Sequence, residues 1–371
     1  MSAWKASASQ ALRRRQWKIL SVVAALSSMW IVFTSALVKM PQLGSASDCA
    51  RCHPAQEGEP LTPMGRALEL PGTNATLSLH PNLTFHKAAY TYTVETHQGK
   101  STYSVTDGAH SITVPISWTF GEGAQTWILE RDGHFYESLV SYYPSVERLD
   151  ITTGDEGLKP ETLDEAIGRR LSEVEVKACF GCHATNAVVN GELSLRTLKP
   201  GVRCEHCHTG VENHLISEAL SGGGDLESAP PALGRLNSEG ISNFCGQCHR
   251  TWDLVVRSGW RGASNVRFQP YRLANSRCFD GTDHRISCVA CHDPHQTVVR
   301  DEVSYDVKCL ACHAAFSSNG LVASPGKEKG CPVAKSKCVS CHMPKVPLPN
   351  GLMTFYDHQI RIVKPGESYP Y

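Results

Sequence analysis

The five-residue pattern Cys-x-x-Cys-His occurs seven times in the 371 residues, and no other feature constrains the fold as strongly. Two thiols at this spacing, followed at once by a histidine, are typical of a c-type haem attachment site. The thiols bond to the porphyrin edge and the histidine binds the iron. The cysteines are Cys49, Cys52, Cys179, Cys182, Cys204, Cys207, Cys245, Cys248, Cys288, Cys291, Cys309, Cys312, Cys338 and Cys341. The proximal histidines are His53, His183, His208, His249, His292, His313 and His342. The pattern therefore predicts seven covalently attached haem c groups.

A single copy of this pattern has other interpretations. It fits a thioredoxin-like pair or half of a zinc site. Zinc needs its ligands grouped in fours, and the first copy, Cys49–His53, has no neighbouring partner motif. Seven copies with the histidine always in the same place argue against zinc and against disulfides, and they indicate a heptahaem cytochrome c.

The density of motifs limits how this part of the chain can fold. Six of them lie between Cys179 and His342, one for roughly every 27 residues. About 27 residues per haem are too few to build an ordinary apolar core. The porphyrins must therefore supply much of the apolar packing. We expect a multihaem cytochrome c fold, haem-packed, with short α-helices, loops and little regular structure.

The stretch before the second motif has a different pattern. Between residues 77 and 154, runs rich in β-branched and aromatic residues are separated by turn signals such as Gln98-Gly99 and Asp132-Gly133, which predicts a small antiparallel β-rich insert. From Pro160 to Lys177, apolar residues recur at helical spacing, which predicts one helix leading into the second motif.

The N-terminus predicts export. Met1 to Lys18 is basic, and Ile19 to Val38 is an uncharged run of 20 apolar or small residues. That length fits a cleaved signal peptide or a retained membrane helix, and we favour the single-helix anchor because the run exceeds a usual signal core. The positive flank puts the rest of the chain outside the cytoplasmic membrane, in the periplasm or at the cell surface. If the helix is retained, the haem at Cys49 lies within about 35 Å of the membrane.

These observations divide the chain into five segments. They are a signal peptide or signal anchor (1–40), a haem 1 segment (41–76), the β-rich insert (77–154), a hexahaem domain (155–345) and a C-terminal wrapping tail (346–371). A Gly- and Pro-rich loop around residues 221–231 separates the third and fourth motifs.

The second axial position of each iron needs a further ligand, and ten histidines lie outside the proximal positions. His206 lies inside a motif and points away from its own iron, so nine candidates remain for seven haems. The best are His295, which closes Cys-His-Asp-Pro-His, His214, six residues after the third motif, and His358 in the tail. The next candidates are His284, His110 and His86, and Met64 is a candidate for haem 1.

Two cysteines lie outside the motifs. They are Cys278 and Cys331. In an oxidising compartment a disulfide is the default for such a pair; two buried thiols are the alternative.

Charge excludes one class of partner. Beyond residue 47 the chain carries 30 basic and 36 acidic side chains, a net charge of −6. A basic nucleic-acid footprint is absent, and the negative body favours a basic redox partner.

Several phrases together resemble the family of multihaem cytochromes related to the tetrahaem cytochrome c-554. They are Cys179-Phe-Gly-Cys-His-Ala-Thr, Gly201-Val-Arg-Cys-Glu-His-Cys-His, Asn243-Phe-Cys-Gly-Gln-Cys-His-Arg, Arg267-Phe-Gln-Pro-Tyr-Arg-Leu-Ala, Ser287-Cys-Val-Ala-Cys-His-Asp-Pro-His, Cys338-Val-Ser-Cys-His-Met-Pro-Lys and Asp357-His358. The resemblance covers Cys179 to Ile362 well and Cys49 to Gly154 more loosely. It implies mostly bis-His haems in stacked and perpendicular pairs, distal ligation by His214, His295 and His358, and electron transfer. Seven haems, the β-rich insert and the N-terminal run depart from the namesake, so partner and pathway do not transfer.

Three functions fit the sequence. We favour an exported electron carrier or conduit between redox proteins over an enzyme. The second is a multihaem enzyme acting on a small nitrogen or sulfur oxide at one open haem, although the Cys-x-x-Cys-Lys variant that marks the active haem of pentahaem nitrite reductase is absent. The third is a membrane-anchored quinol dehydrogenase, without a recognisable quinol pocket. The sequence leaves a homo-oligomer open.

Overall fold

The computed structural model describes residues 49–221, 233–313, 331, 333–364, 366–367 and 369. The apolar run at residues 19–38 and the Gly/Pro-rich loop at 222–232 lie outside the described residues. Within the described ranges, no helix combines the length and apolar character that a membrane span requires. The choice between signal peptide and anchor therefore stays a prediction.

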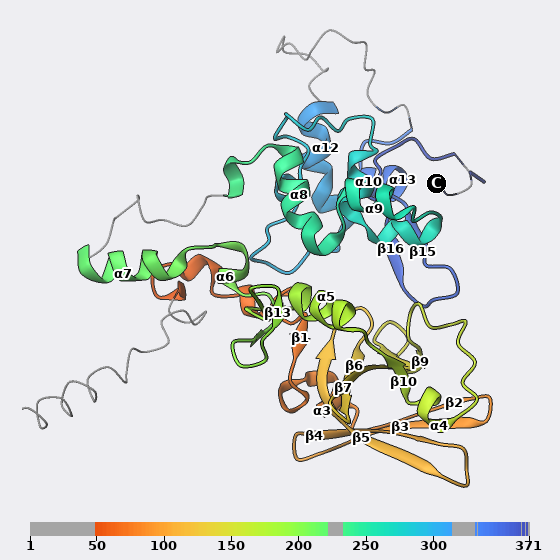
Figure 1. Ribbon diagram of the computed structural model, residues 1–371. Helices are drawn as coiled ribbons and strands as arrows, with labels where there is room; N and C mark the ends of the chain where they lie inside the picture. Colours follow the sequence, from red (N-terminus) through yellow and green to blue (C-terminus); the bar gives the residue numbers. More distant parts are fainter. Residues whose placement is uncertain are drawn as a thin grey trace, which may run out of the picture.

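A sheet of eight antiparallel strands forms one end of the molecule (Figure 1). Its path runs β10-β7-β6-β5-β4-β3-β2, and β1 pairs with β5. The bounds are β1 (Leu68–Glu69), β2 (Asn82–Lys87), β3 (Tyr90–His97), β4 (Lys100–Thr106), β5 (Ser111–Phe120), β6 (Thr126–Arg131), β7 (His134–Ser138) and β10 (Gly168–Arg170). A hairpin of β8 (Val140–Tyr143) and β9 (Arg148–Ile151) packs beside it. The predicted antiparallel insert is confirmed in kind, but the sheet is larger than expected and extends beyond residues 77–154 at both ends.

The turns explain why these strands pair in this register. Gln98-Gly99 and Asp132-Gly133 all have positive φ, between 52° and 75°, as a two-residue type I′ hairpin turn requires. His97 consequently faces Lys100, and Arg131 faces His134. Alternate residues of each strand then point to one face and form the core.

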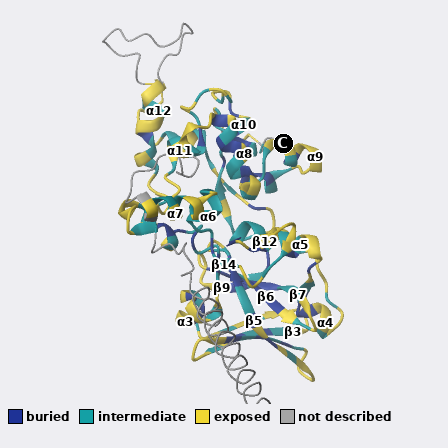
Figure 2. Cartoon of the chain, turned by 60° about the vertical axis from the view of Figure 1, so that its left-hand side comes forward, coloured by how far each residue is buried: buried dark blue, intermediate teal, exposed yellow. Residues whose placement is uncertain are grey.

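The apolar cores found among the described residues lie in this half of the chain. One contains Tyr92, Tyr103, Trp127 and Leu149 between the sheet and the β8–β9 hairpin. The other joins β1, β5 and β6 to the second motif through Phe180, whose ring meets Phe120 edge-on at 5.3 Å between centroids. Figure 2 shows these buried positions concentrated in the sheet. The sheet thus forms a folded base against which the second motif is fixed.

The single helix predicted from Pro160 to Lys177 is wrong. The structure has α4 (Leu163–Ala166), then strand β10, then α5 (Glu173–His183). Gly168 has a φ of +150°, and any Cβ there would lie 2.1 Å from the carbonyl oxygen of Glu137, so the chain leaves the helix to pair with β7. Ser172 and Glu175 then start α5 with a reciprocal capping box.

The remaining chain is a set of short helices, as expected (Figure 1). Among the described residues the longest is α8, with 12 residues. The helices are α6 (Cys204–Cys207), α7 (Val211–Ser221), η4 (Leu233–Arg235), α8 (Ser238–His249), α9 (Trp252–Ser258), η5 (Ala263–Arg267), α10 (Gln269–Ala274), α11 (Cys288–Cys291), η6 (Glu302–Tyr305), α12 (Asp306–His313) and α13 (Cys338–His342). Three two-stranded pairs join them: β11 (Ala184–Thr185) with β14 (Lys199–Pro200), β12 (Val188–Val189) with β13 (Glu192–Leu193), and β15 (Lys345–Pro347) with β16 (Thr354–Tyr356). Each of the last six motifs coincides with a short helix or with the end of a longer one.

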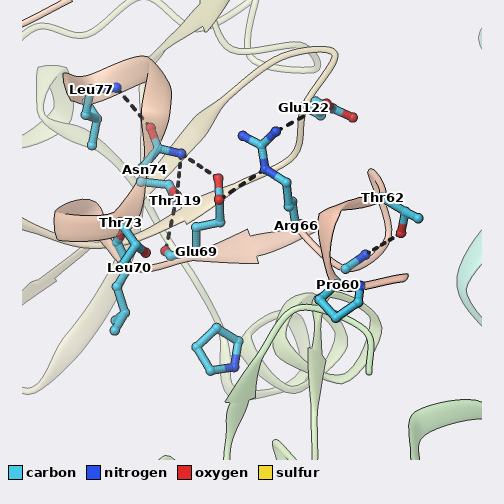
Figure 3. Close-up of polar contacts among 12 residues, drawn as sticks. Pro60, Thr62, Arg66, Glu69, Leu70, Thr73, Asn74, Leu77, Thr119 and Glu122 are labelled. Carbon is cyan, nitrogen blue, oxygen red and sulfur yellow. Dashed lines mark hydrogen bonds and ion pairs between the residues drawn. The ribbon is translucent and has the colours of Figure 1, made fainter. Parts of the chain in front are cut away.

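A connector after the first motif ties the two halves together. It contains η1 (Pro54–Gln56), η2 (Glu59–Leu61), η3 (Pro71–Thr73) and α3 (Ala75–Leu79). Asn74 caps α3 and binds Glu69, and Arg66 contacts both Glu69 and Glu122 (Figure 3). Gly201, just before the third motif, approaches Gly65 so closely that a Cβ would lie 1.8 Å from its carbonyl oxygen. Only glycine permits this contact between the connector and the third motif.

The C-terminal tail is held by a buried ion pair. Arg272 on α10 donates from Nε and Nη2 to the two carboxylate oxygens of Asp357, at 2.8 and 2.9 Å. Arg361 donates to the same carboxylate at 2.6 Å. Arg272 is 2% exposed and Asp357 is fully buried. This pair fixes the tail to α10, and the β15–β16 hairpin is its regular element.

Candidate haem site

Six of the seven motifs open onto one continuous cavity of about 4800 Å³. Both cysteines and the histidine of every motif from Cys179 to His342 line it. Small-molecule pockets are roughly 300–1,000 Å³, so this space is several times too large for one ordinary ligand. The residues of the first motif, Cys49–His53, do not line this cavity.

The cavity occupies the place where a core would otherwise be. The buried members of both apolar cores of the described residues end by Ala187, and the last residue packed against them is Leu198, whereas five of the six cavity motifs begin after it. Protein interiors are close-packed, with few voids larger than a water molecule. A polypeptide with this void needs large apolar groups to fill it, and haems attached to the lining cysteines have the required size, shape and chemistry. The residues present therefore fit covalent haem c.

Three proximal histidines face a second histidine across a gap. Ring centroids are 6.5 Å apart for His53 and His214, 6.1 Å for His208 and His295, and 6.2 Å for His292 and His358. Metal–nitrogen bonds of about 2.0–2.1 Å on each side, with ~1 Å from each nitrogen to its ring centre, place two imidazoles on one metal roughly 6 Å apart. The spacing is therefore that of two imidazoles on opposite sides of one iron.

Backbone carbonyl groups fix the orientation of several of these rings. A carbonyl oxygen can only accept, so the imidazole Nδ1 must carry the proton, and Nε2 keeps its lone pair for a metal. The donor and acceptor pairs are His183 with Ala67 at 3.0 Å, His342 with Arg361 at 2.8 Å, and His358 with Tyr356 at 3.0 Å. His295 is held by the carboxylate of Asp293 at 3.1 Å.

Burial keeps His358, the histidine that faces His292, neutral. Desolvation lowers the pKa of His358 to about 4. Burial likewise lowers the pKa values of His183, His249 and His292. A neutral imidazole is the form that binds a metal, so these side chains are ready ligands at neutral pH.

Contacts between thiols place the motifs in a spatial order. Thiols of different motifs lie within hydrogen-bonding range in four pairs: Cys49 with Cys204, Cys182 with Cys248, Cys245 with Cys288, and Cys309 with Cys338. Three further pairs lie within charge-interaction range: Cys207 with Cys245, Cys207 with Cys248, and Cys291 with Cys309. Counting motifs along the sequence, the spatial order is 1–3–4–5–6–7, and motif 2 branches from motif 4.

The structure does not bring the other predicted ligands to a facing proximal ring. His110 is exposed in the β4–β5 turn beside Asp107, and His86 on β2 bonds Thr91. His284 is exposed and is not part of the cavity wall, whereas Met64 is part of it. The imidazole facing His53 belongs to His214 rather than to a methionine. As axial ligands, these four residues stay predictions without a structural partner.

Cys278 and Cys331 are both exposed and both lie on the cavity wall. Their predicted disulfide stays a prediction.

Sequence reasoning missed several charged residues of this region. Glu59 lies on the cavity wall, 6% exposed, and its Oε2 has no hydrogen-bond partner among the described residues. Burial raises its pKa. Glu137 also lines the wall and pairs with Arg169. Because all three come from outside the motif-rich stretch, no motif spacing could have indicated them.

Comparisons with known proteins found a family match over part of the chain and a similar solved structure. Residues 153–209, which include the second and third motifs, match the family described as cytochrome c554 and c-prime. No curated protein matches the chain. A solved structure, the outer cell wall cytochrome OcwA, is similar with 13% identity and a TM-score of 0.39, covering 85% of this chain and 79% of that one.

Residues 153–209 are thus a cytochrome c554/c-prime multihaem domain. That family implies covalent haem c, and the chain is a multihaem c-type cytochrome. Electron transfer is the function that this family supports.

Proposed function

We propose that this chain binds seven covalent haem c groups and conducts electrons along them between redox proteins outside the cytoplasmic membrane. The observation that carries the proposal is the continuous cavity into which six motifs open. When bound, the haems supply the one-electron chemistry. The chain supplies thioether anchors, neutral imidazole ligands and burial, which together set the potentials.

The arrangement of motifs supports a conduit. Thiol neighbours link six motifs in a series from Cys49 to Cys338, and the remaining motif branches from the fourth. Haems attached in this order are neighbours, so an electron can pass from one to the next. The three facing imidazole pairs give the haems at motifs 1, 3 and 5 two histidine ligands each, with His214, His295 and His358 as distal ligands.

Location and partners follow from the sequence. Haem c is attached outside the cytoplasmic membrane, and the basic, then apolar, N-terminus directs export. Residues 19–38 act as the anchor, and the net charge of −6 beyond residue 47 favours a basic redox partner. A quinol donor and a homo-oligomer are the remaining partner hypotheses.

The test is a haem count together with a spin-state count on the purified, fully loaded protein. The denatured protein should gain the mass of seven haems, and replacing Cys49 and Cys52 by alanine should remove one of them. Electron paramagnetic resonance should show at least three low-spin irons with two histidine ligands. Fewer than seven haems in wild type would contradict the stoichiometry. An absence of bis-His signals would contradict the ligand assignment.

A second candidate function is ligand chemistry at the haem of the second motif. His183, His249 and His342 make no ring contact with another histidine among the described residues, and the ring beside His183 is Phe120, with centroids 5.0 Å apart. A haem there with an open position would bind a small nitrogen or sulfur oxide. A high-spin iron that binds nitrite would favour this enzyme function, and seven low-spin irons would exclude it.

A further inference from the structure

A cluster of charges lies where the sheet meets the second motif. Arg169 on β10 donates to Glu137 on β7 at 2.6 Å and to Glu175 on α5 at 2.5 Å. Its Nε lies 3.7 Å from Asp155, in the loop after β9. One guanidinium therefore serves three carboxylates, which leaves the cluster with excess negative charge when all three are ionised.

Asp155 is the member of the cluster with the weakest support. It is 7% exposed, and its Oδ2 has no hydrogen-bond partner among the described residues. Burial, then Glu137, and also Glu156 raise the pKa of Asp155, Arg169 lowers it, and together they bring the pKa to about 6. A buried carboxylate with a free oxygen is a site that a proton can occupy.

Glu175, the carboxylate of the cluster that lies on α5, has its pKa shifted in the opposite direction. Hydrogen bonds from the backbone and hydroxyl of Ser172, followed by Arg169, lower the pKa of Glu175 to about 2. Glu175 therefore stays ionised at any physiological pH. Proton exchange in the cluster is thus assigned to Asp155.

The cluster adjoins the second haem attachment site. Glu137 lines the cavity together with Cys179, Cys182 and His183. The charges of Glu137 and Arg169 both act on the Cys179 thiol, which is one helical turn from Glu175. A change in charge at this haem is therefore felt by the cluster, and the reverse also holds.

We propose that Asp155, held by Arg169 and Glu137, is a proton-binding site coupled to reduction of the haem on Cys179 and Cys182. The inference rests on the proposed function, since it requires a haem at this motif. With haem bound, the Asp155 carboxylate would take up one proton from water for each electron that reaches this haem from the motif-4 haem. On oxidation both leave, so electrons and protons balance in each direction.

The direction of the pH dependence follows from these charges. Below about pH 6 Asp155 holds its proton in both redox states, so the midpoint potential of this haem does not depend on pH there. Above that value the oxidised state loses the proton, and reduction draws one in. The midpoint potential therefore falls as pH rises above about 6. The sheet domain thus gives one haem of the chain a pH-dependent potential.

The experiment uses full-length, haem-loaded protein with the substitution Asp155→Asn. The first readout is a series of redox titrations between about pH 5 and about pH 9. The second is proton uptake on full reduction, followed with a pH indicator in weakly buffered solution. We expect wild type to take up more protons than Asp155→Asn, by at most one per molecule, with one of the seven redox steps losing its pH dependence. The matched control is Asp164→Asn, an exposed carboxylate of the same domain that pairs with Arg131.

The inference is overturned if Asp155→Asn, Asp164→Asn and wild type all carry seven haems and take up the same number of protons. The proposed function would remain intact. If Asp155→Asn loses the haem of motif 2, Glu137→Gln replaces it. Removing that neighbouring charge should lower the pKa of Asp155 and shift the pH-dependent window downward, and an unshifted window overturns the inference. If peptide mapping of the wild-type protein finds no haem on Cys179 and Cys182, the proposed function itself is overturned.

Discussion

The group that hydrogen-bonds one ring nitrogen of a histidine orients the ring and leaves the other nitrogen free to bind a metal. In this chain the holding groups are mostly backbone carbonyl oxygens from distant segments, such as Ala67 for His183, 116 positions away. The local context of His214, His295 and His358 indicated these three residues, and each faces a proximal imidazole at about 6 Å. The carbonyl partners could not be predicted, because every residue has a carbonyl and only the fold selects one.

The proposed distal role of His358 predicts a specific spectroscopic change. Replacing it with alanine should leave the haem of His292 without its second imidazole and convert one iron from low spin to high spin. Electron paramagnetic resonance of the oxidised protein measures this, and carbon monoxide binding to one additional haem checks it. His284→Ala is the control, since His284 is exposed and outside the cavity wall. A high-spin signal from His284→Ala, and none from His358→Ala, would reverse the assignment.

At the scale of elements, alternation and turn signals were sufficient for the hairpins of the sheet. The interrupted helix after Pro160 was missed, because Leu163, Ile167 and Leu171 recur at helical spacing even though a strand separates them. The deciding contact, Gly168 against the backbone of Glu137, is a tertiary one that no local pattern contains. The same holds for the tail, where the sequence indicated wrapping but not the Arg272–Asp357 pair that fixes the tail to α10.

The Arg272–Asp357 pair predicts that the protein loses stability when the carboxylate is removed. Asp357→Asn should leave two guanidiniums, Arg272 and Arg361, without their carboxylate, and breaking one partner of a buried pair costs about 3–5 kcal/mol. Because His358 follows directly and Arg361 supplies the carbonyl for His342, two haem environments should change together. Denaturant unfolding monitored by haem absorbance measures both effects. Asp283→Asn, at the surface ion pair with Arg285, is the control and should leave the free energy of unfolding nearly unchanged.

At the scale of the molecule, the order of motifs in space differs from their order in sequence. The first motif adjoins the third, and the second lies beyond the fourth, because the sheet is inserted between motifs 1 and 2 and carries the second motif on α5. Motif counting along the sequence predicts seven haems but not this branching. In the described part of the chain, only the fourth motif, Cys245 to His249, has thiols within hydrogen-bonding or charge-interaction range of three other motifs.

The branching predicts which haem the conduit cannot lose. Replacing Cys245 and Cys248 by alanine should remove the motif-4 haem and separate motifs 1 and 3 from motifs 5, 6 and 7. Partial pulse reduction followed by absorbance measures redistribution of electrons within the molecule, and this phase should be lost. Replacing Cys338 and Cys341 removes a haem at the end of the chain and should preserve the phase. If both variants redistribute electrons at the same rate, the fourth haem is not the junction, because electrons then have a route between the two groups that avoids it.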